Sequence, residues 1–404
     1  MKLNECSFSY ICFVIELTIL VKNIFEIQSY SNFLKKKGGN AMKNSFKITF
    51  RVVKSHLNIK AMMGFLVIVV MLGGGCKSKS EDPGATGETL RFVFMADCRG
   101  ISIADQVNYP VLNTIISQIG ALSPKPSFVM FGGDMSYSGY INSAYTFQAW
   151  KDLFAPLTGN GILLYTVLGN HELYLSSSDS GFFLGNQQAF QQVFLENPAN
   201  GPDGYKHLTY SFTSPGGNSF FAVLDAYYLT HSFKDSTMGG NIDSTQMSWL
   251  KAQVAQTKAT HKFLFIHSPY YYVNYDPEEP SAANKSYTEL WAFLDANKFD
   301  LYACGHSHLY SRKTIDSSVL PNPQTTPPTP PWQNNVVQLL NGTCGTHIET
   351  THIDTAIRAA WNVHNDSLTY YFSVVDISGS TATVNSYRGN TGVYSVFDTF
   401  TIHK

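Results

Sequence analysis

The sequence predicts an α/β fold with a largely parallel sheet and a second sheet near the carboxyl terminus. Five short apolar runs past residue 89 are rich in β-branched and aromatic residues, which is typical of buried strands. Amphipathic helical patterns lie between several of these runs, and strand–helix–strand units favour a parallel sheet. Alternating apolar and polar residues at 370–376, 381–387 and 395–402 predict further strands, which we assign to the second sheet.

The composition of the 404-residue chain allows a sizeable core and gives little general attraction to polyanions. Hydrophobic residues make up 44% and charged residues 14%, far from the composition of disordered proteins. The net charge of −1 favours no nucleic-acid binding. A site for a phosphate-bearing small molecule must therefore take its positive charge from metal ions or from a few Arg and Lys side chains.

The first 75 residues have the pattern of a targeting region. Within the stretch 54–75, basic residues precede an apolar run at 61–72 and three glycines follow it, which is the order of an export signal peptide. The run is about a dozen residues long, which is short for a membrane span. The part before Met42 fits no signal, and Met42, Met62 or Met63 are alternative starts of the chain.

Cys76 directly follows the three glycines and resembles the lipid-carrying cysteine of a bacterial lipoprotein signal. We therefore predict an exported protein of the cell envelope, in the periplasm or at the cell surface, held at the membrane by a lipid anchor or by the signal segment. A plain cleaved signal or a single membrane anchor is the alternative. Residues 76–88 are polar and contain Gly and Pro, which predicts a tether before a folded domain at 89–404.

The predicted elements follow in order along the folded domain. Strands are expected at 90–95, 127–131, 162–168, 219–224, 262–266 and 299–303. Helices are expected at 107–122, 145–157, 245–257 and 287–297. The Pro-rich stretch 321–332 predicts a surface loop.

Five of the predicted strands each end in a cluster of polar side chains. The residues in these clusters are, in chain order, Asp97, Asp134, Tyr137, Asn170, His171, His267, His306 and His308. Because ligands bind at the carboxyl ends of parallel strands, we expect one site to collect them. Carboxylate, amide, phenolate and imidazole groups suit hard divalent and trivalent metals. Two such metals about 3.5–4 Å apart can clamp a phosphoryl group and share a hydroxide.

These motifs together resemble the calcineurin-like metallophosphoesterase superfamily, and most of all its purple acid phosphatase branch. The resemblance rests on Asp97, on the segments 133–137 (GDMSY), 169–172 (GNHE) and 265–271 (FIHSPYY), and on 305–308 (GHSH). It implies two mixed β-sheets packed as a sandwich with flanking helices, in four α/β/β/α layers.

The resemblance also implies roles for these residues. Asp97, Tyr137 and His308 would hold the first metal, whereas Asn170, His267 and His306 would hold the second. Asp134 would bridge both metals. His171 would face the substrate and protonate the leaving oxygen. The implied metals are Fe(III) at the first position and Fe(II), Zn(II) or Mn(II) at the second.

Two positions depart from the pattern of the superfamily. Arg99 stands where many members have a metal-binding His, and a guanidinium does not ligate metals. Tyr137 is placed to replace that ligand, and Arg99 is predicted to touch a substrate phosphate. Pro277 lies where members often carry a further substrate-facing His.

The sequence therefore predicts a metal-dependent phosphoric ester hydrolase. It would use a hydroxide shared by the two metals on small-molecule phosphate esters, as an acid phosphatase-like monoesterase. A phosphodiesterase acting on nucleotides or other diesters is one alternative. A surface lipoprotein that binds metal or phosphate without turnover is another.

Other Cys, His and Glu side chains near these motifs are not assigned to the metals. Cys98 and Cys304 are interpreted as small buried residues, and a disulfide among Cys98, Cys304 and Cys344 stays open. His231, His347 and His352 are interpreted as structural or exposed residues. Glu172 is predicted to orient a neighbouring residue.

Overall fold

The computed structural model describes residues 87–404 except 140–142, 175–180, 230–232, 236–239, 272–284, 318–331, 349–361, 365–368 and 391. The chain divides into two units, 1–80 and 81–404, and only the second contains described residues. The targeting region, Cys76 and almost all of the predicted tether lie outside the described residues, so their boundaries stay predictions. The same holds for Pro277, His231, His352 and nearly all of the Pro-rich stretch. Within the described ranges, no helix is long and apolar enough to cross a membrane.

The first sheet joins the amino-terminal and carboxyl-terminal parts of the folded unit. Its strand order is β17 (Tyr394–His403), β16 (Thr381–Gly389), β15 (Tyr370–Ser378), β1 (Thr89–Met95), β4 (Phe128–Phe131) and β5 (Leu163–Thr166). β1, β4 and β5 run parallel, whereas β15 pairs antiparallel with β1 along its length. Our assignment of the last three strands to the second sheet was therefore wrong, because β15 extends the sheet that β1 begins.

The second sheet has a parallel centre and antiparallel edges. Its strand order is β14 (Asn362–His364), β12 (Tyr310–Ile315), β13 (Val336–Asn341), β11 (Leu301–Cys304), β10 (His261–Phe265), β8 (Ser219–Val223) and β7 (Tyr210–Thr213). The four strands from β13 to β8 are parallel. Two short ladders pair β2 (Arg99–Ser102) with β3 (Asp105–Val107), and β6 (Gly181–Phe183) with β9 (Phe233–Asp235).

The two sheets pack face to face through a core of aromatic and aliphatic side chains. Phe92 of β1 contacts Phe221 of β8 and Phe263 of β10, with both pairs of ring centroids 5.4 Å apart. At one edge, Arg312 of β12 donates two hydrogen bonds to the carboxylate of Asp398 in β17. Both contacts join the sheets directly, so the predicted sandwich is confirmed.

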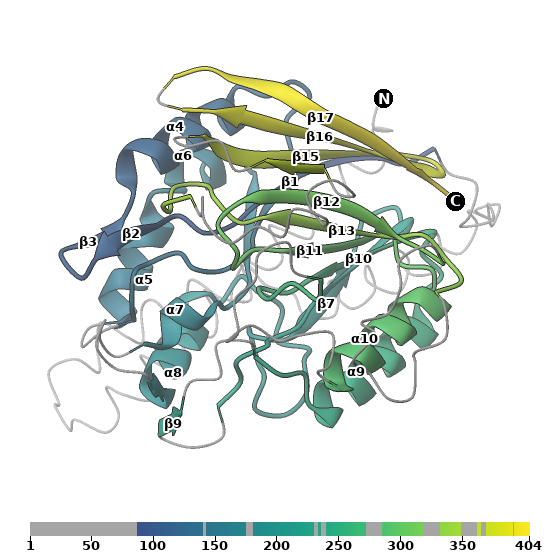
Figure 1. The fold of residues 1–404 in the computed structure, drawn as a ribbon, viewed down its shortest axis with the longest axis horizontal. Coiled ribbons are helices and arrows are strands. Elements are labelled where there is room, and N and C mark those ends of the chain that lie inside the picture. The colour runs from purple at the N-terminus through teal and green to yellow at the C-terminus, as the bar shows by residue number, and fades with distance from the viewer. Residues whose placement is uncertain are drawn as a thin grey trace, which may run out of the picture. The chain divides into compact units, whose positions relative to one another are not determined.

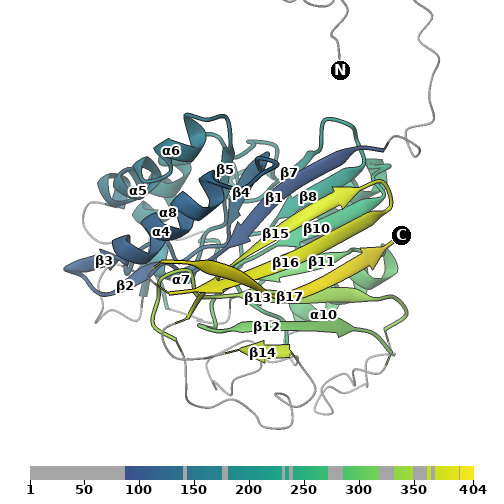
Figure 2. The same cartoon turned by 90° about the horizontal axis from the view of Figure 1, so that it is seen from above.

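Helices cover the outer faces of the sandwich. Figures 1 and 2 show α4 (Tyr109–Gly120), α5 (Ser143–Asp152) and α8 (Leu184–Val193) on one side and α10 (Lys285–Ala296) on the other. α4, α5 and α10, together with α9 (Ser244–Gln256), confirm the predicted helices, whereas α8 was not predicted. The helix expected at 145–157 is split into α5 and α6 (Ala155–Thr158), because Pro156 starts a new helix and cannot continue the old one.

Candidate metal centre

The predicted site residues lie at the carboxyl ends of the parallel strands of both sheets. Asp97 follows β1, Asp134 follows β4, and Asn170 begins the short helix α7 (Asn170–Leu173) after β5. His267 and His306 follow β10 and β11 in the other sheet. Because the two sheets end at a common edge, residues up to 209 positions apart are hydrogen-bonded to each other there.

The backbone at this edge has an unusual conformation. Asp97, Asp134 and His306 have φ angles of 60°, 55° and 75°. Asp and His are among the side chains that tolerate this left-handed region, and such strain gathers at functional sites where the surroundings enforce it. Gly133 has φ 98°, and an added Cβ there would lie 2.6 Å from His267 Nδ1. A glycine is therefore required where the β4 loop passes the histidine.

Hydrogen bonds between the two sheets fix the carboxylate and imidazole groups. The His306 backbone amide donates to both carboxylate oxygens of Asp97 at 3.1 Å. His267 Nδ1 donates to the Gly132 carbonyl at 2.7 Å. His306 Nδ1 lies 3.1 Å from Asn170 Oδ1. The side chains that the sequence assigns to the second metal are thus neighbours before any ion is considered.

Asp97, Asp134 and His267 are buried, and each offers a ligand atom within 4.8 Å of the others. A carbonyl oxygen can only accept, so the Nδ1 of His267 carries a proton and Nε2 is the ring atom left for the site. Nε2 lies 3.2 Å from Asp134 Oδ1 and has no hydrogen-bond partner among the described residues. A histidine oriented by a backbone carbonyl is the usual arrangement of a metal ligand, so these residues fit a metal ion.

The electrostatics of this group call for a cation. Burial opposes a charged His267, but Asp134 and Asp97 outweigh burial and raise the pKa of His267 to about 10. Burial alone would raise the pKa of Asp134, whereas His267, His171 and Arg99 hold it well below its usual range. Burial raises the pKa of Asp97 well above its usual range, so this carboxyl favours its protonated form. A bound metal ion could take the place of that proton.

The other two predicted histidine ligands are held neutral. Burial, and then the charge of His267, lower the pKa of His306 to about 3. Burial, and then Arg99, lower the pKa of His308 well below its usual value. Neutral imidazole is the form that binds metals, so both rings are suited to ligation.

His171 lies in α7, after β5, and contacts the loop that follows β4. Its backbone amide donates to Asp134 Oδ1 at 3.1 Å, and its Nδ1 donates to the Tyr137 carbonyl at 2.6 Å. The ring presents Nε2, 3.9 Å from Asp134 Oδ2. Burial lowers the pKa of His171 to about 4, although Asp134 opposes this effect.

Glu172 fastens the two loops that carry Asp134 and His171. Its buried carboxylate accepts backbone N–H bonds from Gly169 at 2.7 Å, Asp134 at 2.9 Å and Met135 at 2.8 Å. Glu172 therefore holds the loop after β4 against the start of α7, which agrees with its predicted orienting role.

The residues that the sequence assigns to the first metal surround a guanidinium. Arg99 is buried, with Nε 3.7 Å from Asp134 Oδ2 and Nη2 3.4 Å from His308 Nε2. Its Cζ lies 5.8 Å from the centroid of the Tyr137 ring. The structure thus brings Tyr137 and His308 together around Arg99. Among the carboxylate, imidazole and thiol groups of the described residues, His308 does not belong to the compact group of Asp97, Asp134 and His267.

Two residues beside the centre were not singled out by the sequence. The exposed His347, interpreted as structural or exposed, has its ring centroid 4.7 Å from that of His308. The buried Tyr227 has its ring centroid 6.0 Å from that of His267. Tyr227 follows β8, so the strand-end rule that found the other clusters could have found this segment. His347 carries no comparable signal.

The cysteines near the centre are buried thiols. Cys98, Cys304 and Cys344 form no disulfide in the structure, and Cys98 Sγ accepts a hydrogen bond from Trp150 Nε1 at 3.1 Å. The interpretation of Cys98 and Cys304 as small buried residues is confirmed.

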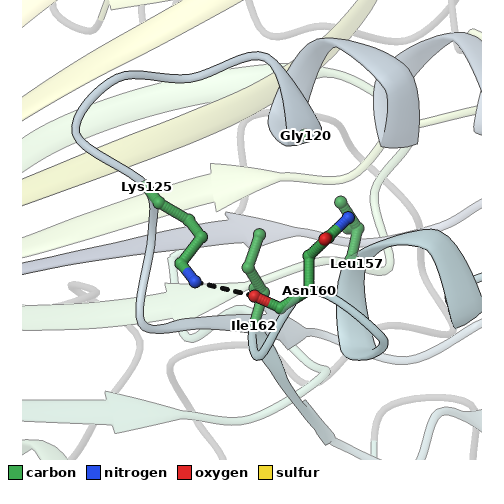
Figure 3. Close-up of a pocket in the computed structure, with 5 residues that line it drawn as sticks. All are labelled: Gly120, Lys125, Leu157, Asn160 and Ile162. Atoms are coloured by element: carbon green, nitrogen blue, oxygen red, sulfur yellow. Dashed lines mark hydrogen bonds between the residues drawn. The ribbon is translucent and has the colours of Figure 1, made fainter.

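A separate cavity lies at the opposite end of the first sheet. It has a volume of about 290 Å³ and is lined by Gly120, Lys125, Leu157, Asn160 and Ile162 (Figure 3). Lys125 and Ile162 precede β4 and β5, and Lys125 Nζ donates to the Asn160 carbonyl at 2.7 Å. None of the predicted site residues lines this cavity.

Known proteins are similar to this chain in sequence. Tartrate-resistant acid phosphatase type 5 of Sus scrofa is 22% identical over 258 residues, which cover 59% of this chain and 70% of that protein. The Rattus norvegicus protein of the same name is 25% identical over 269 residues, which cover 61% and 73%. Both are distant homologues.

Solved structures share the fold. The purple acid phosphatase PPD1 from yellow lupin (Lupinus luteus) seeds superposes with a TM-score of 0.52 and 17% identity, over 80% of this chain. This chain spans just over half of the lupin protein, 55% of its length. PhoD superposes with a TM-score of 0.55 and 12% identity, over 80% of this chain and 71% of PhoD.

The family model described as "Calcineurin-like phosphoesterase" matches residues 90–310. The matched range contains the compact group of Asp97, Asp134 and His267, and a binuclear metal site is typical of the family. The chain therefore belongs to the calcineurin-like phosphoesterases.

Proposed function

We propose that this chain hydrolyses phosphate monoesters of small molecules at a two-metal centre. The observation that carries the proposal is the buried group of Asp97, Asp134 and His267, whose ligand atoms lie within 4.8 Å of one another at the joint edge of the two sheets. The monoester assignment is supported by the distant similarity to two tartrate-resistant acid phosphatases.

The metal ligands follow the two groups of residues at this edge. Asn170, His267 and His306 would hold one ion and Asp97, Tyr137 and His308 the other, with Asp134 shared. We propose Fe(III) beside Tyr137 and Fe(II), Zn(II) or Mn(II) at the other position, because a phenolate favours a hard trivalent ion. Bound ions would supply Lewis acidity, neutralise phosphate charge and lower the pKa of water at the site.

His171 would act on the leaving group. Its Nδ1 proton is held by the Tyr137 carbonyl, so Nε2 is the atom that can donate a proton to the departing oxygen. A bound phosphate dianion next to Nε2 would favour the protonated ring by the same Coulomb effect that Asp134 exerts. Arg99 is the guanidinium available to an ester phosphate.

Paired chromogenic substrates test this proposal. The purified full chain, loaded with metal, should hydrolyse an aryl phosphate monoester faster than the matching diester. Faster turnover of the diester would replace the monoesterase with the phosphodiesterase alternative. Metal binding without turnover of either ester would favour the non-catalytic lipoprotein.

We also propose export and lipid attachment through Cys76, supported by the order of basic, apolar and small residues before it. In a bacterial host, the wild-type chain should enter the detergent phase on phase separation, and Cys76→Ser should move to the aqueous phase. A Cys76→Ser variant that partitions like the wild type would contradict lipidation at this residue.

A further inference from the structure

The two halves of the metal centre are prepared to different degrees. In the second-metal half, defined as Asn170, His267 and His306, backbone and side-chain contacts already orient the rings. His267 is fixed by the Gly132 carbonyl, and His306 Nδ1 lies 3.1 Å from Asn170 Oδ1. In the first-metal half, defined as Asp97, Tyr137 and His308, a positively charged side chain of the protein lies among the ligands.

That side chain is Arg99, which begins β2 directly after the Asp97 loop. Its backbone amide donates to the Asp134 carbonyl at 3.2 Å, which keeps the residue beside the shared carboxylate. The side chain is 9% exposed, and its Nε has no hydrogen-bond partner among the described residues. The guanidinium is therefore inside the centre, with a donor still to be satisfied.

Arg99 uses the atoms that the first metal would need. A guanidinium can only donate, so the lone pair of His308 Nε2 accepts from Nη2 at 3.4 Å. Nε lies 3.7 Å from Asp134 Oδ2. Because metal bonds to such atoms are about 2.0–2.2 Å long, an ion bound there would lie against the guanidinium. Arg does not lose its charge, so the two cations would repel each other.

We propose that Arg99 acts as an internal cation in the first-metal half, so that the centre loads its two metals in sequence. The second-metal half binds an ion tightly. The first-metal half binds a divalent ion such as Zn²⁺ only at higher concentration, when the guanidinium moves aside. This inference rests on the ligand assignment of the proposed function and adds a metal-dependent regulation to it. Once displaced, Arg99 is free to pair with the phosphate of an ester, which would couple metal loading to substrate binding.

Zinc titration of the full chain tests the proposal. Chelator-treated protein in detergent is dialysed against graded Zn²⁺, and bound zinc per chain is counted by mass spectrometry. The wild type should load in two steps whose affinities differ at least about tenfold. Arg99→Gly should tighten the weaker step about tenfold or more and leave the tighter step unchanged. Arg99→Lys, which keeps the charge, should retain two steps.

Matched controls distinguish an effect of Arg99 from the general effect of losing an arginine. Arg91→Ala removes an arginine that pairs with Asp376 at the other end of β1, and it should titrate like the wild type. If Arg99→Gly does not fold by circular dichroism, Arg99→Gln serves in its place. A wild type that takes up both ions in one step, or an Arg99→Gly protein with an unchanged weak step, would overturn sequential loading. Monoester turnover at saturating zinc is measured in parallel, so that sequential loading can fail while the hydrolase function stands.

Discussion

The two halves of the metal centre are built by different means. The second-metal half uses geometry: His267 is oriented by a backbone carbonyl and His306 lies against Asn170. The first-metal half uses charge: Arg99 contacts Asp134 and His308 and lies over Tyr137. The contact between His306 and Asn170 places no charged side chain among the ligands of the second-metal half, whereas the first-metal half contains the Arg99 cation. If Arg99 acts as we propose, the two similar ligand sets will bind metals unequally.

The largest expected effect comes from the residue that both halves share. Asp134→Asn removes the buried carboxylate beside His267 and Arg99, so both ions should bind poorly. Because bound metals contribute several kcal/mol to catalysis, kcat/KM for a monoester should fall by about a thousandfold or more. Metal content and steady-state kinetics are measured together. A variant that keeps both ions and full turnover would show that Asp134 belongs to neither half.

A smaller loss is expected from His171→Ala, which leaves both halves intact. Removing a general acid costs about 100- to 10,000-fold in rate, and the loss should shrink for esters with good leaving groups. Metal content should stay at the wild-type level. His403→Ala, an exposed histidine at the end of β17, is the control. Equal losses for good and poor leaving groups would count against proton donation.

Tyr137→Phe tests the first-metal half alone, because Tyr137 is not a proposed ligand of the second metal. If Tyr137 binds Fe(III), the wild type should absorb visible light, and the variant should lose this absorption together with the iron of the first half. Activity should fall by about ten- to a hundredfold, as for other changes that perturb a metal site. Tyr145→Phe, which changes a 70% exposed tyrosine, should change nothing. An active wild-type enzyme without colour or iron would contradict the proposal of Fe(III) beside Tyr137. Its membership of the calcineurin-like phosphoesterases would still hold.

The smallest effect on catalysis is expected from Glu172→Gln. This variant tests the hydrogen bonds that hold together the loops carrying Asp134 and His171. The amide cannot accept all the backbone N–H bonds that the carboxylate accepts from Gly169, Asp134 and Met135. The free energy of unfolding should fall by about 1–3 kcal/mol, because buried donors lose their partner. Chemical denaturation measures this change. Glu289→Gln, at an exposed ion pair with Lys251, should leave stability unchanged. An equal loss of stability in both variants would show that the hydrogen bonds of Glu172 do not hold the two loops.

Much of the fold was predictable because local pattern decides it. The strands that precede Asp97, Asp134 and His267 are short buried runs. β1 and β4 are parallel neighbours, so their carboxyl ends meet at one edge, whereas β10 reaches the same edge from the other sheet. The placement of β15 to β17 was not predictable, because alternation shows that a segment is a strand but does not name its partner. Pro156 could have predicted the break between α5 and α6.

The site was predictable in its residues and less so in its contacts. The motifs name the side chains, but the position of the Arg99 guanidinium depends on the pairing of β2 with β3 and on a contact with His308, 209 residues away. The proximity of His347 to His308 depends on the loop after β13 in the same way. Such contacts arise from tertiary packing, which a local pattern does not encode.

Removal and return of metal tests the central claim most directly. The full chain is stripped with a chelator, assayed on a phosphate monoester, and assayed again after metal is restored, beside a His267→Ala variant. We expect no turnover without metal, recovery of turnover in the wild type when metal is restored, and no recovery in His267→Ala. Turnover that survives metal removal, or a His267→Ala variant that recovers fully, would contradict a phosphoesterase that works through this centre.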